Sequence, residues 1–234
     1  MSECKTVFTT AIILAAGIGS RFGSLLPKQK IELLGKSLLK RSVESFYQCN
    51  KVDSIVVVTR REDIDFAKQE LHFATDKICS IIAGGNSRAE SAKLGFYSIP
   101  KETTHVAIHD GARCIIDCEN ISKVIDSAIK FGAASAVKKI IDTIKLIDGD
   151  NIKSTVSRDK LVMAETPQVF EKELYEKAIS QIESLDSITD DNMLVESIGV
   201  DIKMVELTCE NPKITYASDF KYAEFLLKRR GAND

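Results

Sequence analysis

The sequence predicts an α/β protein with a Rossmann-like, mostly parallel sheet flanked by helices. Two observations lead to this fold class. Short β-branched runs alternate with amphipathic helical stretches along the chain, which is typical of βαβ units. The run over residues 54–59 (SIVVVT) is also apolar toward both faces, as buried parallel strands are. Because the chain has 234 residues, we expect one domain over residues 1–234.

The individual elements follow from periodicity and from the residues that bound them. Strands are expected where β-branched residues gather between turns, over residues 7–14, 54–59, 78–83, 105–109, 133–137 and 202–207. Helices are expected where apolar residues recur at helical spacing, over residues 37–49, 62–73, 88–97, 121–131, 171–182, 191–198 and 218–228. Ser37 stands where it can cap the first of these helices.

Residues 138–162 break this rhythm. Two β-branched stretches, 140–147 and 152–156, flank a turn over 148–151 and predict a protruding β-hairpin arm. The arm carries apolar residues at alternate positions, namely Ile140, Ile144, Leu146, Ile152 and Val156. A two-stranded arm cannot bury such a face by itself, so we expect it to pack on a second copy of the chain in a homodimer.

Bulk composition restricts the partners and the compartment. Lys and Arg number 32 against 34 acidic residues, and this balance argues against nucleic acid as a partner. The start shows no apolar run behind a basic flank, and the longest apolar stretch, residues 11–17, is too short to cross a bilayer. We therefore expect neither a signal peptide nor a membrane partner. The six cysteines form no C-x-x-C pair and are typical of reduced thiols, which favours a cytoplasmic protein.

A glycine-rich segment over residues 14–23 (LAAGIGSRFG) follows the first strand, where clustered backbone N–H groups can hold phosphate oxygens. It does not complete the dinucleotide-binding pattern G-x-G-x-x-G, because Phe22 occupies the third glycine position. A Walker P-loop is also incomplete, because Lys30 replaces its first glycine. The third interpretation is a nucleoside-triphosphate turn in which Arg21 and Lys28 bind the phosphates.

Seven short motifs are spaced along nearly the whole chain. They are residues 14–23 with 27–29 (PKQ), 84–91 (GGNSRAES), 109–113 (HDGAR), 142–143 (DT), 166–168 (TPQ), 189–191 (TDD) and 211–215 (NPKIT). In this order they resemble the methylerythritol-phosphate cytidylyltransferases, a family of sugar-phosphate nucleotidyltransferases. Any one motif is weakly specific, but seven in the same order make a specific resemblance.

The resemblance implies a role for each matching residue. Catalytic roles are implied for Arg21 and Lys28, which would bind the CTP phosphates, and for Lys213, whose ammonium would lie at the phosphate of the acceptor. CTP binding is implied for Ala15, Ala16, Gly17, Gly19, Gly85, Arg88, Ser91 and Gly111. Binding of the acceptor, a sugar-alcohol phosphate, is implied for Asp110, Arg113, Thr143, Arg158 and Thr166. Of these, Thr143 and Arg158 would reach into the site of the neighbouring subunit.

Three positions depart from the family pattern. Asn86 and Ser157 stand where aspartate is common, and Cys114 replaces a proline. Mg²⁺ is the expected cofactor, carried on the CTP phosphates rather than by protein ligands. A metal site built on His105 and His109 is disfavoured, since four residues of strand separate them by about 13 Å.

The implied reaction joins CTP and 2-C-methyl-D-erythritol 4-phosphate into the CDP-alcohol and pyrophosphate, in the non-mevalonate isoprenoid pathway. A phosphomonoester has its second pKa near 6, so the attacking oxygen needs no general base at neutral pH. Two alternatives remain open. One is a ribitol-5-phosphate cytidylyltransferase, and the other is a non-catalytic nucleotide-binding module on the same fold.

Overall fold

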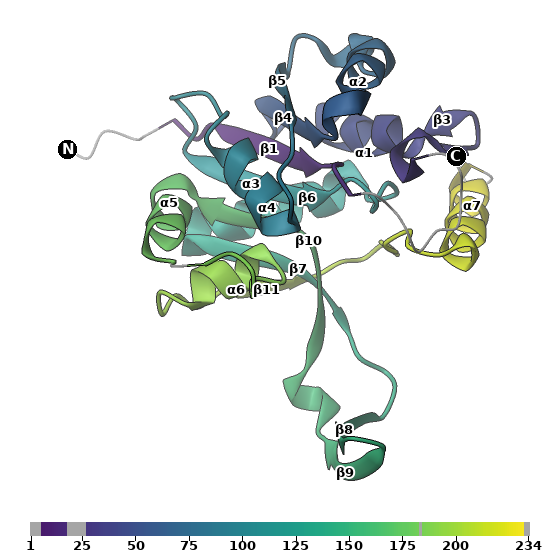
Figure 1. The fold of residues 1–234 in the computed structure, drawn as a ribbon, viewed down its shortest axis with the longest axis vertical. Coiled ribbons are helices and arrows are strands. Elements are labelled where there is room, and N and C mark those ends of the chain that lie inside the picture. The colour runs from purple at the N-terminus through teal and green to yellow at the C-terminus, as the bar shows by residue number, and fades with distance from the viewer. Residues whose placement is uncertain (1–5, 18–26, 183, 232–234) are drawn as a thin grey trace.

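The structure is a computed structural model that describes residues 6–17, 27–182 and 184–231. Its central sheet consists of β1 (Thr9–Leu14), β4 (Ser54–Thr59), β5 (Ile78–Ala83), β6 (His105–Asp110), β7 (Ala133–Lys139), β10 (Val162–Glu171) and β11 (Lys203–Glu206). The order is β11-β7-β10-β6-β1-β4-β5, and β10 alone among these strands runs antiparallel to its neighbours (Figure 1). The predicted fold class is therefore confirmed.

Helices cover both faces of this sheet. They are α1 (Leu38–Tyr47), α2 (Ile64–Glu70), α3 (Arg88–Phe96), α4 (Cys118–Phe131), α5 (Lys172–Gln181), α6 (Asp191–Glu196) and α7 (Ala217–Gly231). The layer of α1, α2 and α4 receives Ala11 and Ile13 of β1, whereas the layer of α3, α5 and α6 receives Ile12 and Leu14. Burial of both faces explains why β1 and β4 are nearly continuous apolar runs. Among the residues that the structure describes, every helix is too short or too polar to cross a bilayer.

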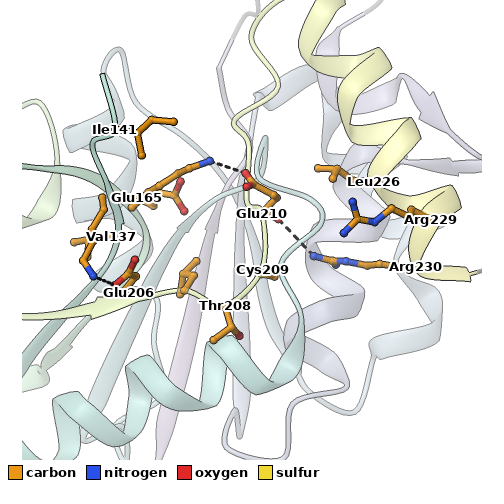
Figure 2. A pocket seen from close by; sticks show the side chains of 13 residues that line it. Val137, Ile141, Glu165, Glu206, Thr208, Cys209, Glu210, Leu226, Arg229 and Arg230 are labelled. Carbon is orange, nitrogen blue, oxygen red and sulfur yellow. Dashed lines mark hydrogen bonds and ion pairs between the residues drawn. The ribbon is translucent and has the colours of Figure 1, made fainter. Parts of the chain in front are cut away.

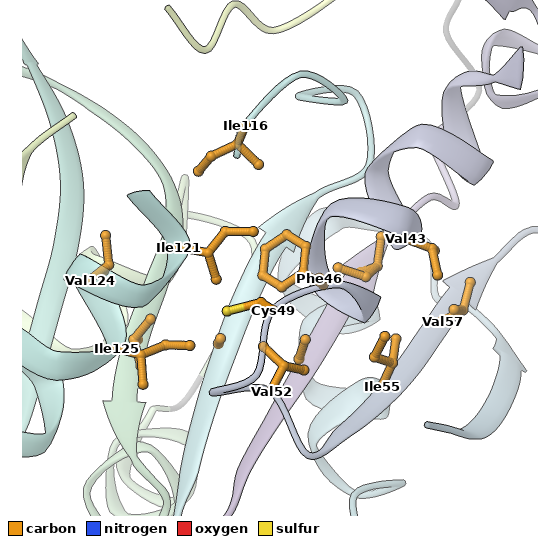
Figure 3. Packing of buried hydrophobic residues seen from close by; sticks show 14 of the residues in the cluster. Val43, Phe46, Cys49, Val52, Ile55, Val57, Ile116, Ile121, Val124 and Ile125 are labelled. Carbon is orange, nitrogen blue, oxygen red and sulfur yellow. The ribbon is translucent and has the colours of Figure 1, made fainter. Parts of the chain in front are cut away.

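The larger core lies between the sheet, α1 and α4. Figure 3 shows Phe46 of α1 and Cys49 just beyond it, packed against Ile121 and Ile125 of α4. Several helices begin at a side-chain cap, in which a side-chain oxygen accepts a hydrogen bond from the backbone N–H three residues on. These caps are Ser37, Ser87, Asp117 and Asp190, so the predicted Ser37 cap is confirmed.

The pattern of the sequence does not predict β10, a ten-residue strand. Pro167 interrupts its apolar pattern, and proline usually argues against an internal strand. The structure accommodates the proline in a bulge: between Ala164 and Gln168, β10 advances four residues while β7 advances two. The helix expected over 62–73 is also divided, into a 3₁₀ turn at Arg61–Asp63, then α2, then a second 3₁₀ turn.

β7 and β10 run beyond the core and lead into an arm that projects from the body of the molecule (Figure 1). The arm ends in a hairpin of β8 (Ile144–Asp148) and β9 (Asn151–Val156), and Gly149 between them has a positive φ of 56°. The predicted arm is confirmed, although its first strand begins at Ile144 rather than at residue 140. Ile147 and Ile152 pair across the hairpin and are 65% and 67% exposed.

Candidate active site

A cleft of about 700 Å³ opens at the carboxyl ends of β1, β4, β5 and β6. Strands that end side by side leave a crevice there, and open α/β sheets bind their ligands in such crevices. Two segments distant in sequence, around Lys28 and Lys213, complete the walls. The lining residues are Leu14, Ala16, Gly17, Lys28, Gln29, Arg60, Arg61, Glu62, Gly84, Gly85, Asn86, Ser87, Arg88, Ser91, Asp110, Ala112, Lys213 and Thr215.

The end of the cleft above β5 is formed by glycine backbone. A Cβ on Gly84 would lie 2.5 Å from the Cβ of Ala16 and 2.7 Å from Oγ of Ser91, so a side chain there would need these segments to move apart. The Ser91 hydroxyl accepts a hydrogen bond from the N–H of Gly85 at 3.1 Å and donates to the carbonyl of Ser87 at 2.8 Å. The Ser91 hydroxyl therefore fixes the backbone of the glycine loop through these two hydrogen bonds.

Three basic side chains meet at the opposite end, above β6. Lys213 Nζ lies 2.6 Å from Oδ2 of Asp110, and Arg88 Nε lies 3.0 Å from its Oδ1. Lys28 Nζ donates to the carbonyl of Ile214 at 2.9 Å, which brings it next to the Lys213 segment. Burial alone would raise the pKa of the Asp110 carboxyl, but the charges of Arg88 and Lys213 hold that pKa well below its usual value. Asp110 is therefore an anion that fixes two cations.

Arg88 has a second anchor that sequence reasoning missed. Its NH1 donates to Oδ2 of Asp191 at 2.7 Å, and Oδ1 of Asp191 accepts the hydroxyl hydrogen of Tyr175 at 2.6 Å. Asp191 and Tyr175 are both buried. Burial lowers the pKa of Arg88, but the two carboxylates more than offset this effect and raise the pKa above its usual value. The TDD motif contains Asp191, yet nothing in a spacing of 103 residues indicates that it reaches Arg88.

The bulge of β10 places Thr166 against the end of β6. Its hydroxyl accepts the N–H of Asp110 at 3.1 Å and donates to Nδ1 of His109 at 3.0 Å. His109 Nε2 donates to the carbonyl of Arg113 at 3.0 Å, because a carbonyl can only accept, so the neutral ring has its hydrogen on Nε2. Burial lowers the pKa of His109 to about 4. With both ring nitrogens engaged, His109 offers no lone pair to a metal ion.

Arg113 follows this turn but does not line the cleft. Its NH1 donates to the carbonyl of Asn211 at 2.6 Å and lies 3.6 Å from Oε1 of Glu165. Glu165 belongs to the β10 bulge, so the bulge aims the side chain of Thr166 at the end of β6 and that of Glu165 at the segment after it. Arg113 is thus held within the chain by an acidic partner and a backbone carbonyl.

Glu165 also lines a second cleft, of about 520 Å³, between the base of the arm, β11 and α7 (Figure 2). Glu210 lies between the walls of this cleft: its carboxylate is 2.6 Å from Lys138 Nζ, and its carbonyl accepts from Arg230 at 3.5 Å. Because the charged groups of the second cleft largely pair with one another, it offers an anionic ligand less uncompensated charge than the first cleft.

A comparison with known proteins then decides the family. The sequence model of the family described as IspD, 2-C-methyl-D-erythritol 4-phosphate cytidylyltransferase, matches residues 9–229. The chain belongs to this family. The 2-C-methyl-D-erythritol 4-phosphate cytidylyltransferase of Endomicrobium trichonymphae is 38% identical over 219 residues, covering 93% of this chain and 98% of that protein. The protein of the same name from Caldanaerobacter subterraneus is 37% identical over 224 residues, covering 94% and 99%.

Solved structures lead to the same family. The 4-diphosphocytidyl-2C-methyl-D-erythritol synthase of Anaerococcus prevotii has a TM-score of 0.84 at 30% identity, covering 95% of this chain and 97% of that chain. The 2-C-methyl-D-erythritol 4-phosphate cytidylyltransferase of Francisella tularensis has a TM-score of 0.79 at 27% identity, covering 94% and 99%. The predicted family is confirmed, and with it the enzyme class: this cytidylyltransferase family member is a nucleotidyltransferase.

Many of the residues for which the family resemblance implies a catalytic or binding role lie at the first cleft. Those that line it are Ala16, Gly17, Lys28, Gly85, Arg88, Ser91, Asp110 and Lys213. Ala15 is buried just below, and the N–H of Gly111 bonds to the carbonyl of Leu14 at 2.8 Å, so both shape the cleft from beneath. Arg21 and Gly19 lie outside the described residues. Sequence reasoning also missed Arg60 and Arg61, although two arginines directly after a buried strand were an available signal.

The two arm residues stand apart. Thr143 and Arg158 line neither cleft, and Arg158 donates to the carbonyl of Ile141 within the arm. Of the departures from the family pattern, Asn86 lines the first cleft. Cys114 is buried, and burial raises the pKa of its thiol to about 12, so it is an uncharged core residue.

Proposed function

We propose that the first cleft binds CTP and 2-C-methyl-D-erythritol 4-phosphate, and that the chain joins them into the CDP-alcohol with release of pyrophosphate. This is the reaction of its family and a step of the non-mevalonate isoprenoid pathway. The observation that carries the proposal is that one cleft combines the close backbone of Gly84 and Gly85 with cations, of which Arg88 and Lys213 are paired to Asp110 and Lys28 lies beside the Lys213 segment. A close backbone suits a flat base and ribose, and fixed cations suit phosphates.

The chemistry then follows from charge and position. The acceptor phosphate is already an anion at neutral pH, so the barrier arises mainly from bringing two anions together in line. Lys28 and Lys213 lie at adjacent points of the cleft wall and would bind the phosphates between them. Asp110 holds Arg88 and Lys213 in place and is itself suited to accept hydrogen bonds from acceptor hydroxyls. Because these cations are fixed before substrates arrive, little reorganisation is needed during attack.

We propose Mg²⁺ as the cofactor, bound to the triphosphate of CTP. The carboxylates that line the described part of the cleft are paired with cations: Asp110 with Arg88 and Lys213, and Glu62 with Arg60 at 3.1 Å. Within the described residues, no three His, Cys, Asp or Glu side chains are grouped to hold a metal. Phosphate oxygens and water are donors that Mg²⁺ prefers, and Mg²⁺ bound to them would neutralise part of the triphosphate charge.

We also propose a homodimer in which the arm completes the partner's site. The arm exposes Ile141, Ile147 and Ile152, and an arm clasping a second copy would bury them. Thr143 and Arg158 would then contact the acceptor in trans. The described cysteines are free thiols, which fits the reducing cytoplasm that we propose as the compartment, and neither nucleic acid nor membrane is among the proposed partners.

A pyrophosphate-release assay tests the reaction, with each of the four nucleoside triphosphates against a panel of sugar-alcohol phosphates. We expect turnover with CTP, methylerythritol 4-phosphate and Mg²⁺, and poor turnover with ATP or with ribitol 5-phosphate. Equal or faster release with ribitol 5-phosphate would change the acceptor. A folded protein that binds CTP but releases no pyrophosphate with any acceptor would be a binding module instead.

A further inference from the structure

A buried carboxylate lies beside the cleft without lining it. Asp63 ends the 3₁₀ turn Arg61–Asp63 that leaves β4, and only 3% of its surface is exposed. Its Oδ1 lies 2.7 Å from Nζ of Lys30, and its Oδ2 accepts a hydrogen bond from Nε of Arg60 at 2.6 Å. One anion is therefore clamped between two cations.

The two cations belong to different walls of the cleft. Arg60 lines the cleft where β4 ends. Lys30 ends the 3₁₀ turn Lys28–Lys30, which also presents Lys28 to the cleft. The Lys30 ammonium lies 5.0 Å from the centre of the Phe66 ring in α2, so the turn contacts the β4 exit and the helix that follows it. Asp63 thus links the segment that carries Lys28 to the end of a central strand.

The two cations keep the carboxyl group of Asp63 ionised. Burial alone would raise the pKa of its carboxyl, but the hydrogen bonds and charges of Lys30 and Arg60 lower that pKa below its usual value. Removing the charge would leave two partly buried cations facing each other. Breaking such a pair from one side is far more damaging than losing an exposed ion pair, because the remaining charges lose their compensation.

We propose that Asp63 is a positioning residue that acts through Lys30 to hold Lys28 at the phosphate-binding end of the cleft. The inference rests on the proposed role of Lys28. A 3₁₀ turn of three residues has little stability of its own, so tertiary contacts must fix its place. A displacement of a catalytic group by about 1 Å can reduce a rate by up to about 100-fold. The clamp therefore controls rate through position without touching the substrates.

The test compares kcat/KM for CTP, at saturating acceptor, in the full-length chain and its Asp63→Asn variant. We expect a loss of roughly tenfold in folded protein, since Lys28 is displaced but not removed. In a Lys28→Ala background, Asp63→Asn should cause little further loss, because there is no longer an ammonium to misplace. The matched control is Glu44→Gln, which neutralises one carboxylate of the more exposed Lys36–Glu44 pair at 2.7 Å and should keep full activity.

Several results would overturn the proposed role of Asp63. Equal losses from Asp63→Asn with and without Lys28 would show an effect independent of Lys28 and would overturn the inference, as would full activity of folded Asp63→Asn. If Asp63→Asn does not fold, Lys30→Met takes its place, since Lys30 is 29% exposed and its stem remains. A fully active Lys30→Met chain would then overturn the inference. Near-normal turnover of Lys28→Ala would instead remove the proposed role of Lys28, and this inference with it.

Discussion

In the cleft, Asp110 is 7% exposed and lies between Arg88 and Lys213, and Arg88 is in turn held by Asp191. In the arm, Ile147 and Ile152 face solvent over about two thirds of their surface. The cleft therefore has buried charges whose partners lie within the same chain. The arm has apolar side chains that this chain leaves uncovered.

The two regions differ in which contacts stabilise them: those of the cleft form within one chain, whereas those of the arm require a second chain. A buried ion is tolerated only when partners compensate it, so the ion pairs of the cleft must form within each chain before substrate arrives. An exposed apolar hairpin gains stability only when a second surface covers it. Variants in the cleft should therefore act within each subunit, and variants in the arm should act between subunits.

The largest expected effect concerns pH and the buried ring behind the cleft. An unfolded His109 takes up a proton near pH 6.5, whereas the folded ring does so only near pH 4. Between these values the unfolded state binds more protons, so the free energy of unfolding falls as the pH falls. At roughly 1.4 kcal/mol per pKa unit, the loss is about 3 kcal/mol, more than a hundredfold in the folding equilibrium.

Urea unfolding at a series of pH values measures this loss. His109→Gln should reduce the slope between pH 6.5 and pH 4, leaving the part due to His105, whose pKa burial also lowers. The arm variant Ile152→Ser should keep the full slope. A wild-type unfolding free energy that is flat across this window would contradict a buried, neutral His109 and would weaken the contrast between the two regions.

The next effect tests the cationic end of the cleft. Lys28→Ala removes an ammonium aimed at the reacting phosphates, so kcat should fall by about 100-fold or more while the fold persists. Arg21→Ala should behave alike on the sequence evidence. Lys36→Ala, which shortens a lysine paired with Glu44 outside the cleft, is the matched control. Steady-state pyrophosphate release and circular dichroism measure both properties, and a folded Lys28→Ala chain with normal turnover would refute the role.

A mixing experiment tests whether Arg158 of the arm acts in the site of the partner subunit. Arg158→Ala and Lys28→Ala chains should each be nearly inactive alone. If subunits exchange and Arg158 acts in trans, half of the dimers in an equal mixture are mixed, and each has one intact site. Activity should then return to about a quarter of the wild-type value. No recovery, with mixed dimers verified by native mass spectrometry, would mean that Arg158 serves its own subunit or none.

The smallest effect on folding is expected in the arm itself. Ile152→Ser should change the unfolding free energy of the dilute monomer by no more than about 0.5 kcal/mol, because the side chain is already 67% exposed. The same variant should weaken dimerisation, as measured by analytical ultracentrifugation over a concentration series. Ile121→Ser, at a fully buried position of α4, is the contrast and should cost about 3 kcal/mol or more. An unchanged dimer would argue against the arm as the interface.

Local pattern was sufficient for much of the fold. The runs at β4 and β5 have the predicted bounds, because the apolar residues of each run are nearly contiguous. Both faces of β4 are buried, whereas β5 lies at the edge of the sheet and is only partly buried. β10 escaped detection because Pro167 sits in a bulge, where it removes no regular ladder bond. The two carboxylates that bind Lys30 and Arg88, Asp63 and Asp191, escaped for another reason. Each pairs with a residue distant in sequence, and only the folded chain brings such residues together.

The site residues divide in the same way. Gly85 and Lys28 lie in short motifs whose composition already suggests phosphate or base contacts, and both line the cleft. Arg113 lies in an equally clear motif, yet Glu165 and Asn211 hold it elsewhere. A motif shows which side chains could bind a ligand. Which of them reach the cleft, and which pair with other residues of the chain, depends on how the folded chain packs.

β10 connects the base of the arm to the cleft. From Val162 to Ala164 the strand is paired with β7 at the base of the arm, and two residues later its Thr166 hydroxyl holds His109 and the backbone of Asp110. The bulge begins at this point, so pairing with β7 at the base of the arm and support for the end of β6 depend on one short stretch of chain. The residues that attach the arm and the residue that supports Asp110 are therefore near neighbours in sequence, and neither position can be shifted along the chain without the other.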